Sequence, residues 1–172
     1  MGQRIDQQSI QVLGVPSAPK ATIDQLAIQV LAVVVNPIHQ LSGYLKDALI
    51  DHIFRSAAFP KPLGLWISLF TLPPSPTSDG IEVTGNAYAR CRYDPSEANW
   101  TPPTSGDGTT SNGFDITFVK PTGPWGLIMA YGIHDSASGG NLLAYSTIAT
   151  PRSVDATSSP RFVAGDLTVT LN

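Results

Sequence analysis

"WGLIMAYGIHD" at residues 125–135 and "NLLAYSTIAT" at residues 141–150 are two apolar runs, with the short stretch "SASGG" between them. Aliphatic and aromatic residues fill both runs, and runs of this length and composition predict β-strands. The intervening Ser and Gly residues predict a tight turn. The two runs are therefore interpreted as neighbouring strands joined by a hairpin, and they form the centre of the predicted fold.

Four more runs, on both sides of this pair, have the same character. They lie at residues 63–71, 81–94, 113–120 and 166–172, with polar loops at 72–80 and 95–112. Within 81–94 apolar and polar residues alternate, and Gly85-Asn86 predicts a bulge or kink. About six strands without intervening helices predict a mainly β fold, an antiparallel β-sandwich.

One short α-helix is predicted at about residues 43–57. Apolar residues recur there at spacings of three and four, Ser42 is a candidate N-cap, and Pro60 forbids continuation. The apolar stripe consists of Tyr44, Leu45, Leu49, Ile53 and Ala57, with Ile50 and Phe54 alongside. We expect it to pack against a sheet or a neighbouring helix, because burial of each large side chain contributes roughly 1.5–3 kcal/mol.

A repeat sets an N-terminal segment, residues 1–38, apart from the sandwich at residues 39–172. "IDQQSIQVL" at 5–13 returns as "IDQLAIQVL" at 23–31, and eight of eleven residues are identical between 5–15 and 23–33. Both stretches are predicted strands, with Pro16 and Pro19 interrupting the connector. An isolated two-stranded hairpin is marginal in water, so the strands must add to another sheet and serve as an anchoring arm. The predicted partner-binding residues are Ile5, Ile10, Val12, Leu13, Ile23, Leu26, Ile28, Val30 and Leu31.

Composition argues against several classes of protein. Charged residues make up 13% of the 172 residues, the net charge is −3, and lysine and arginine do not cluster, so no nucleic-acid partner is expected. The apolar run at residues 30–35 is far shorter than the roughly 20 residues that cross a bilayer, so no membrane partner is expected. Cys91 is the single cysteine, which excludes an intramolecular disulfide and a multi-cysteine metal site.

No catalytic constellation emerges from the polar residues. His39, His52 and His134 lie far apart and lack the spacing of zinc ligands, so neither a metal nor a cofactor is expected. "HDSASGG" at 134–140 holds His, Asp and Ser, but adjacent residues on a turn do not usually form a base–nucleophile relay. The chain is therefore predicted to be non-enzymatic. Trp100, in the polar loop, is a candidate surface aromatic for glycan binding.

Several stretches between His52 and the C-terminus resemble a family of small structural proteins from tailed bacteriophages. In order, they are "DHIFR…LWISLFT", "EVTGNAYAR", "SNGFDITF", "PWGLIMAYGIHD", "SGGNLLAYS" and "FVAGDLTVTL". The "RIDQ…IQVL" repeat also looks like the opening segments of phage virion proteins. The resemblance implies a virion component without enzymatic activity. Members are commonly labelled tail-fibre-like, and similar small proteins decorate capsids.

Three functions are expected from these observations. The first is a capsid decoration (cement) protein, a homotrimer that binds the major capsid protein on the outer head surface and stabilises the shell. The second is a tail fibre or tail adaptor protein, and the third is a carbohydrate-binding module. In the first two, the protein resides in the virion after assembly in the host cytoplasm. The sequence leaves open whether the N-terminal strands pair with each other, with sister chains or with the shell.

Overall fold

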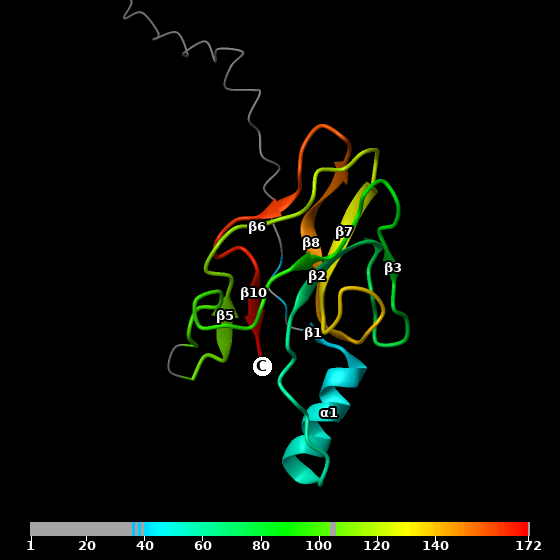
Figure 1. Ribbon diagram of the computed structural model, residues 1–172. Coiled ribbons are helices and arrows are strands. Elements are labelled where there is room, and N and C mark those ends of the chain that lie inside the picture. The colour runs from blue at the N-terminus through cyan, green and yellow to red at the C-terminus, as the bar shows by residue number, and fades with distance from the viewer. Residues whose placement is uncertain (1–35, 37, 39, 104–105, 172) are drawn as a thin grey trace, which may run out of the picture.

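The central hairpin consists of β7 (Gly126–His134) and β8 (Leu142–Val154), as predicted, except that β8 continues four residues beyond the predicted end at residue 150 (Figure 1). The computed structural model describes residues 36, 38, 40–103 and 106–171. Asp135 closes the turn, because its carboxylate accepts hydrogen bonds from the backbone N and the side-chain Nδ2 of Asn141, both at 2.7 Å. Gly140 has a φ of 66°, and a Cβ there would lie 2.4 Å from Asp135 Oδ1. The turn therefore requires glycine at this position.

Short strands extend this hairpin into a six-stranded antiparallel sheet. β2 (Trp66–Leu72) pairs with β7, and β1 (Gln40–Leu41) pairs with β8. The outer edge of β2 is shared by β3 (Ile81–Glu82) and β4 (Cys91–Arg92). Every pairing in this sheet is antiparallel.

The single strand predicted at 81–94 is wrong, because the chain leaves the sheet between β3 and β4. Gly85, Asn86 and Ala87 all have positive φ, at 75°, 48° and 62°, which a continuous strand does not allow. Asn86 holds this loop: its side-chain nitrogen donates to the carbonyl of Pro124 at 2.6 Å. Its own carbonyl accepts from Trp125 Nε1 at 3.0 Å. The predicted kink at Gly85-Asn86 is therefore a full break in the strand.

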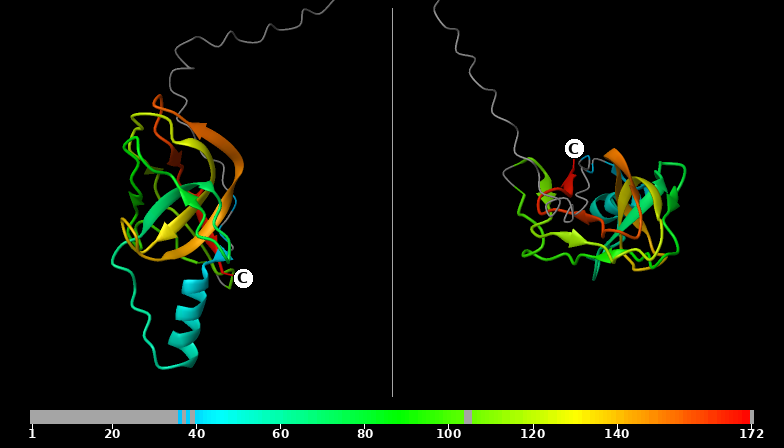
Figure 2. Two further views of the ribbon diagram at one scale, coloured as in Figure 1. Left: turned by 90° about the vertical axis from the view of Figure 1, so that its right-hand side faces the viewer. Right: turned by 90° about the horizontal axis from the view of Figure 1, so that it is seen from above.

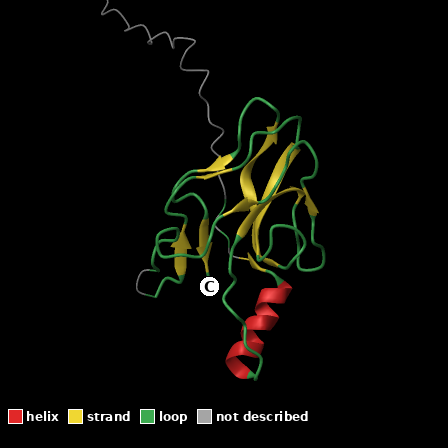
Figure 3. Cartoon of the chain, viewed as in Figure 1, coloured by secondary structure: helices red, strands yellow, loops and turns green. Residues whose placement is uncertain are grey.

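Two two-stranded sheets lie against this sheet (Figure 3). β5 (Thr109–Ser111) pairs with β10 (Thr168–Thr170), and β6 (Ile116–Thr117) pairs with β9 (Arg161–Phe162). The core fills the space between the layers, where the ring of Phe162 lies 5.2 Å from that of Tyr131 and 6.2 Å from that of Phe118. The predicted fold class, a mainly β antiparallel sandwich with one short helix, is confirmed; the predicted N-terminal strands lie outside the described residues.

Asn36 and Ile38 connect the two layers. Asn36 donates from its backbone N to the Thr147 carbonyl on β8 at 3.4 Å. Ile38, fully buried, donates to the Thr168 carbonyl and accepts from Thr170 N on β10, at 2.7 and 2.9 Å. Ile38, which the sequence assigns to the N-terminal segment, therefore lies in the core of the sandwich.

The helix α1 (Gly43–Phe54) projects from one end of the sandwich (Figure 2). Ser42 caps it as predicted, with Oγ accepting from Leu45 N at 3.1 Å, but the helix ends at Phe54 rather than at residue 57. No residue of α1 is buried, and Ile53 and Phe54 are 65% and 78% exposed. The expected packing of its apolar side chains against a sheet or helix is wrong within the described part of the chain, because α1 extends beyond the end of the sheet.

Candidate partner-binding surfaces

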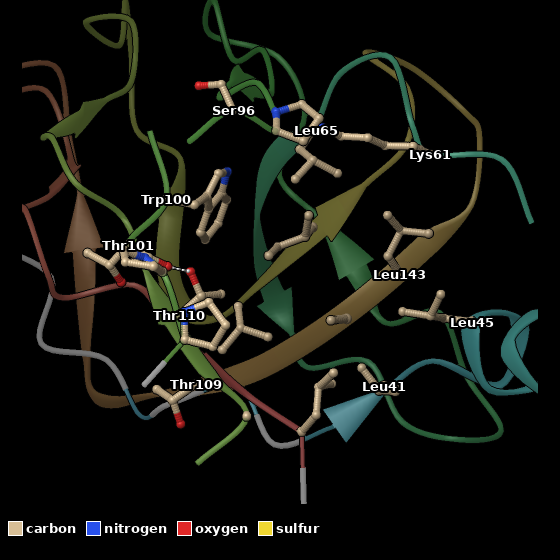
Figure 4. Close-up of a pocket in the computed structure, with 18 of the residues that line it drawn as sticks. Leu41, Leu45, Lys61, Leu65, Ser96, Trp100, Thr101, Thr109, Thr110 and Leu143 are labelled. Carbon is tan, nitrogen blue, oxygen red and sulfur yellow. Dashed lines mark hydrogen bonds between the residues drawn. The ribbon is translucent and has the colours of Figure 1, made fainter. Parts of the chain in front are cut away.

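An apolar groove of about 970 Å³ opens beside the start of α1, between the six-stranded sheet and the β5–β10 pair (Figure 4). Its lining comes from segments far apart in the sequence: Leu41, Leu65, Trp100, Ile133, Leu143, Val169 and Leu171 are among the apolar members. Of the described residues that line it, only Lys61 and Glu97 are charged, and both are exposed. An open, apolar, preformed groove of this size fits an apolar segment of another chain or another part of this one.

Trp100 forms one wall of this groove and is half-buried. Its ring makes an edge contact with Tyr93, with the centroids 5.3 Å apart, and its backbone N donates to the Ser96 carbonyl at 3.0 Å. The indole Nε1 is buried and has no hydrogen-bond acceptor among the described residues. Trp100 thus joins the predicted polar loop to the core, and glycan binding through this residue stays a prediction.

A partly buried polar cluster ties β3 to the turn between β7 and β8. Arg90 forms a two-pronged ion pair with Glu82, at 2.8 Å from Nε to Oε1 and 2.7 Å from Nη2 to Oε2. Its Nη1 donates to the carbonyls of Ser136 and Gly139, at 2.9 and 2.8 Å. Tyr88 donates to Glu82 Oε1 at 2.9 Å. Burial alone raises the pKa of Glu82, but hydrogen bonds from Arg90 and Tyr88 outweigh it and hold that pKa below its usual value.

His134 lies beside this cluster at the end of β7, 6% exposed and stacked on Phe70 with ring centroids 6.3 Å apart. Neither ring nitrogen has a hydrogen-bond partner among the described residues. Burial lowers the pKa of His134 to about 4, and the positive charge of Arg90 adds to this effect. The fold therefore favours the neutral imidazole.

Acid is expected to destabilise the protein through His134. The pKa of His134 in the fold lies below its usual 6.5, so the stability that it contributes is complete above pH 6.5 and is lost as the pH falls towards 4. Between about pH 7 and about pH 5 the loss is about 2 kcal/mol. Urea unfolding of the wild type and of His134→Gln at both pH values measures it, because the variant lacks this titration. Equal losses in the two proteins contradict the prediction.

The side chains considered for catalysis each form a hydrogen bond with a different partner. Ser136 Oγ donates to the Ser138 carbonyl at 3.0 Å, whereas Asp135 binds Asn141 across the turn. The thiol of half-buried Cys91 donates to the Thr117 carbonyl at 3.4 Å, and burial raises its pKa, as for a structural thiol. Within the described ranges, no three His, Cys, Asp or Glu side chains are grouped to hold a metal ion. No helix in those ranges is long and apolar enough to span a membrane.

Most of the chain matches a known protein family. A family model described as podophage GP4 fiber I protein gp80 matches residues 40–170, which is more than half of the chain. The chain belongs to this family. The resemblance to structural proteins of tailed phages is thereby confirmed, and the chain is a structural component of a phage virion. None of the curated proteins matches it.

The match to the fibre I family covers β1 to β10, α1 and the lining of the groove except Leu171, and it begins after the N-terminal repeat. The predicted partner-binding residues between Ile5 and Leu31 precede the matched range and lie outside the described residues. Sequence reasoning missed the groove and the Glu82–Arg90 pair. One available signal was the scarcity of charge in this chain, which makes four charged residues on the stretch at 81–94, Glu82 and Arg90 among them, unusual.

Proposed function

We propose that the protein is a fibre component of a tailed-phage virion, with a structural and non-enzymatic role, and that its N-terminal segment attaches it to the particle. The observation that carries the proposal is the match of the fibre I family to residues 40–170. The repeat at 5–13 and 23–31 precedes that range and is rich in Ile, Val and Leu. The start of the matched range at residue 40 therefore supports two parts, a sandwich shared with the family and a separate N-terminal segment for attachment.

Capsid decoration is the second candidate function, with the major capsid protein as partner and a homotrimer as the assembly. Its support is the shape of the molecule: the described residues form a sandwich with one 12-residue helix, and they contain no coiled coil or long fibrous repeat. A short body of this kind suits a protein that covers a surface. In both candidates the N-terminal segment supplies the contact with the particle.

Deletion of residues 1–35 is expected to leave the sandwich folded and to abolish incorporation into virions. The deletion spares Asn36 and Ile38, whose hydrogen bonds join β8 and β10, so the core keeps its contacts. It removes both predicted strands, and tethered strands strengthen each other's binding through effective concentration. Circular dichroism and thermal unfolding check the fold, and mass spectrometry of purified particles counts the copies. Particles that carry the truncated protein at the normal copy number would refute the attachment role.

Location in the particle separates the two candidates. A decoration protein covers the head in copies on the order of hundreds, following the symmetry of the shell, whereas a tail fibre follows the lower symmetry of the tail and is present in a few dozen copies or fewer. Electron microscopy of particles whose protein carries a C-terminal label shows which region holds it. Label on the tail supports the fibre component; label distributed over the head supports decoration.

A further inference from the structure

We propose that the apolar groove binds residues 26–30 of a second copy of the chain, so that copies of the protein are joined by exchange of their N-terminal segments. The groove offers apolar walls from β1, β7, β8 and β10, with Trp100 on one side (Figure 4). A surface of this kind, left open in a chain of low charge, is typical of a protein contact. The inference does not depend on which part of the virion the protein occupies.

The occupant is argued from the difference between the two copies of the repeat. Where the first copy has Gln8 and Ser9, the second has Leu26 and Ala27. Side chains alternate between the two faces of a strand, so a strand at 23–31 places Leu26, Ile28 and Val30 on one face. The first copy has only Ile10 and Val12 at the corresponding positions of that face, beside Gln8. The second copy therefore has the more apolar face, which matches the lining of the groove.

The path of the chain from Asn36 into the sandwich indicates that the occupant of the groove comes from another copy. Asn36 contacts Thr147 on β8, and the chain then runs along β8 towards Leu41, which lines the groove. β8 occupies one edge of this segment, and β10 occupies the other at Ile38. Asn36, Ile38 and Gln40–Leu41 therefore offer little free edge on which the preceding repeat of the same chain could pair as a hairpin.

The four residues between the second repeat and Asn36 also indicate that the occupant of the groove comes from another copy. They read "AVVV" at 32–35 and contain no Gly, Pro, Asn, Asp or Ser, the residues that form tight turns. With Leu31, five residues separate the proposed occupant from Asn36; they span at most about 18 Å, so a return path to the groove requires a tight reversal within them. A second copy reaches the groove without this reversal. The first repeat, beyond the Pro16 and Pro19 connector, remains available for another partner.

The test uses the full-length protein with a photo-crosslinking benzoyl-phenylalanine in place of Ile28. On irradiation we expect a covalent dimer on a denaturing gel, and mass spectrometry is expected to map the link to groove residues such as Leu143 or Trp100. The matched control carries the same group in place of Gln29, on the opposite face of the predicted strand, and we expect at least about tenfold less dimer. A groove link within a single chain, a dimer linked elsewhere, or equal yields at the two positions would each overturn the proposal.

A pair of leucine substitutions provides an independent readout. Leu171 lines the groove and is 57% exposed, whereas Leu127 lies at the start of β7, outside the groove, and is 46% exposed. Leu171→Glu places a carboxylate against the apolar occupant and is expected to reduce the dimer yield at least about tenfold, since burial of an unpaired charge is costly. Leu127→Glu is expected to leave the yield unchanged. Loss of the dimer in both variants, or in neither, contradicts the assignment.

Discussion

Arg90→Met is expected to lower the free energy of unfolding by about 1.5–3 kcal/mol, because it removes the charged hydrogen bonds of a partly buried ion pair. The side chain of Arg90 is 9% exposed, and its guanidinium makes four hydrogen bonds, two of them to Glu82. Its loss leaves the Glu82 carboxylate in the fold without its cation and leaves the carbonyls of Ser136 and Gly139 without a donor. Urea unfolding at neutral pH measures the change.

Arg92→Met is the matched control for this experiment. Arg92 is separated from Arg90 only by Cys91, but its side chain is 60% exposed. It pairs with Asp94 at 2.6 Å and lies 5.5 Å from the ring of Trp66. Such an exposed pair contributes about 1 kcal/mol or less. Equal losses for the two variants would show that the Glu82–Arg90 cluster does not hold the turn.

Phe162→Ala is expected to cost about 3–5 kcal/mol of stability, as for other fully buried aromatic residues. Phe162 is fully buried in the two-residue strand β9, and its ring contacts Tyr131 on the opposite layer. Because β9 and β6 share so few backbone hydrogen bonds, side-chain packing must hold this part of the second layer on the sheet. Chemical denaturation, followed by tryptophan fluorescence, gives the midpoint and the slope.

Phe114→Ala serves as the comparison, because this ring is 60% exposed and close in sequence to β6. Substitutions at exposed positions usually change stability by about 0.5 kcal/mol or less. A large loss for Phe114→Ala together with a small one for Phe162→Ala would contradict the assignment of Phe162 to the core.

The long strands were predictable because their signal is local. β2, β7 and residues 142–150 of β8 lie in runs of apolar residues, and Ser42 precedes its helix with the expected capping geometry. The second layer was less predictable: β6 covers two residues of the predicted 113–120 strand, since pairing there depends on the distant β9. The exposure of α1 was not predictable either, because periodicity shows which residues share a face but not what covers that face.

The candidate sites also differ in whether their signal is local in the sequence or arises from contacts between distant segments. The N-terminal repeat is visible in the sequence because its two copies can be compared directly. The groove is not, because Leu41, Trp100 and Leu171 come together only after the two layers have packed. The Glu82–Arg90 pair likewise depends on the loop at residues 85–87. This loop turns the chain back to β2, so that β3 and β4 pair with the same strand.

The outer edge of β2 is divided between two short strands, and this division limits the pairing of neighbouring molecules through that edge. β3 and β4 each pair with β2 over two residues, and β1 covers two residues of β8 on the opposite side. On the β2 side the sheet therefore ends in short, interrupted edges, which protect against uncontrolled growth of a sheet from one molecule into the next. Two copies that meet at this side of the sheet thus find no continuous strand edge along which to pair.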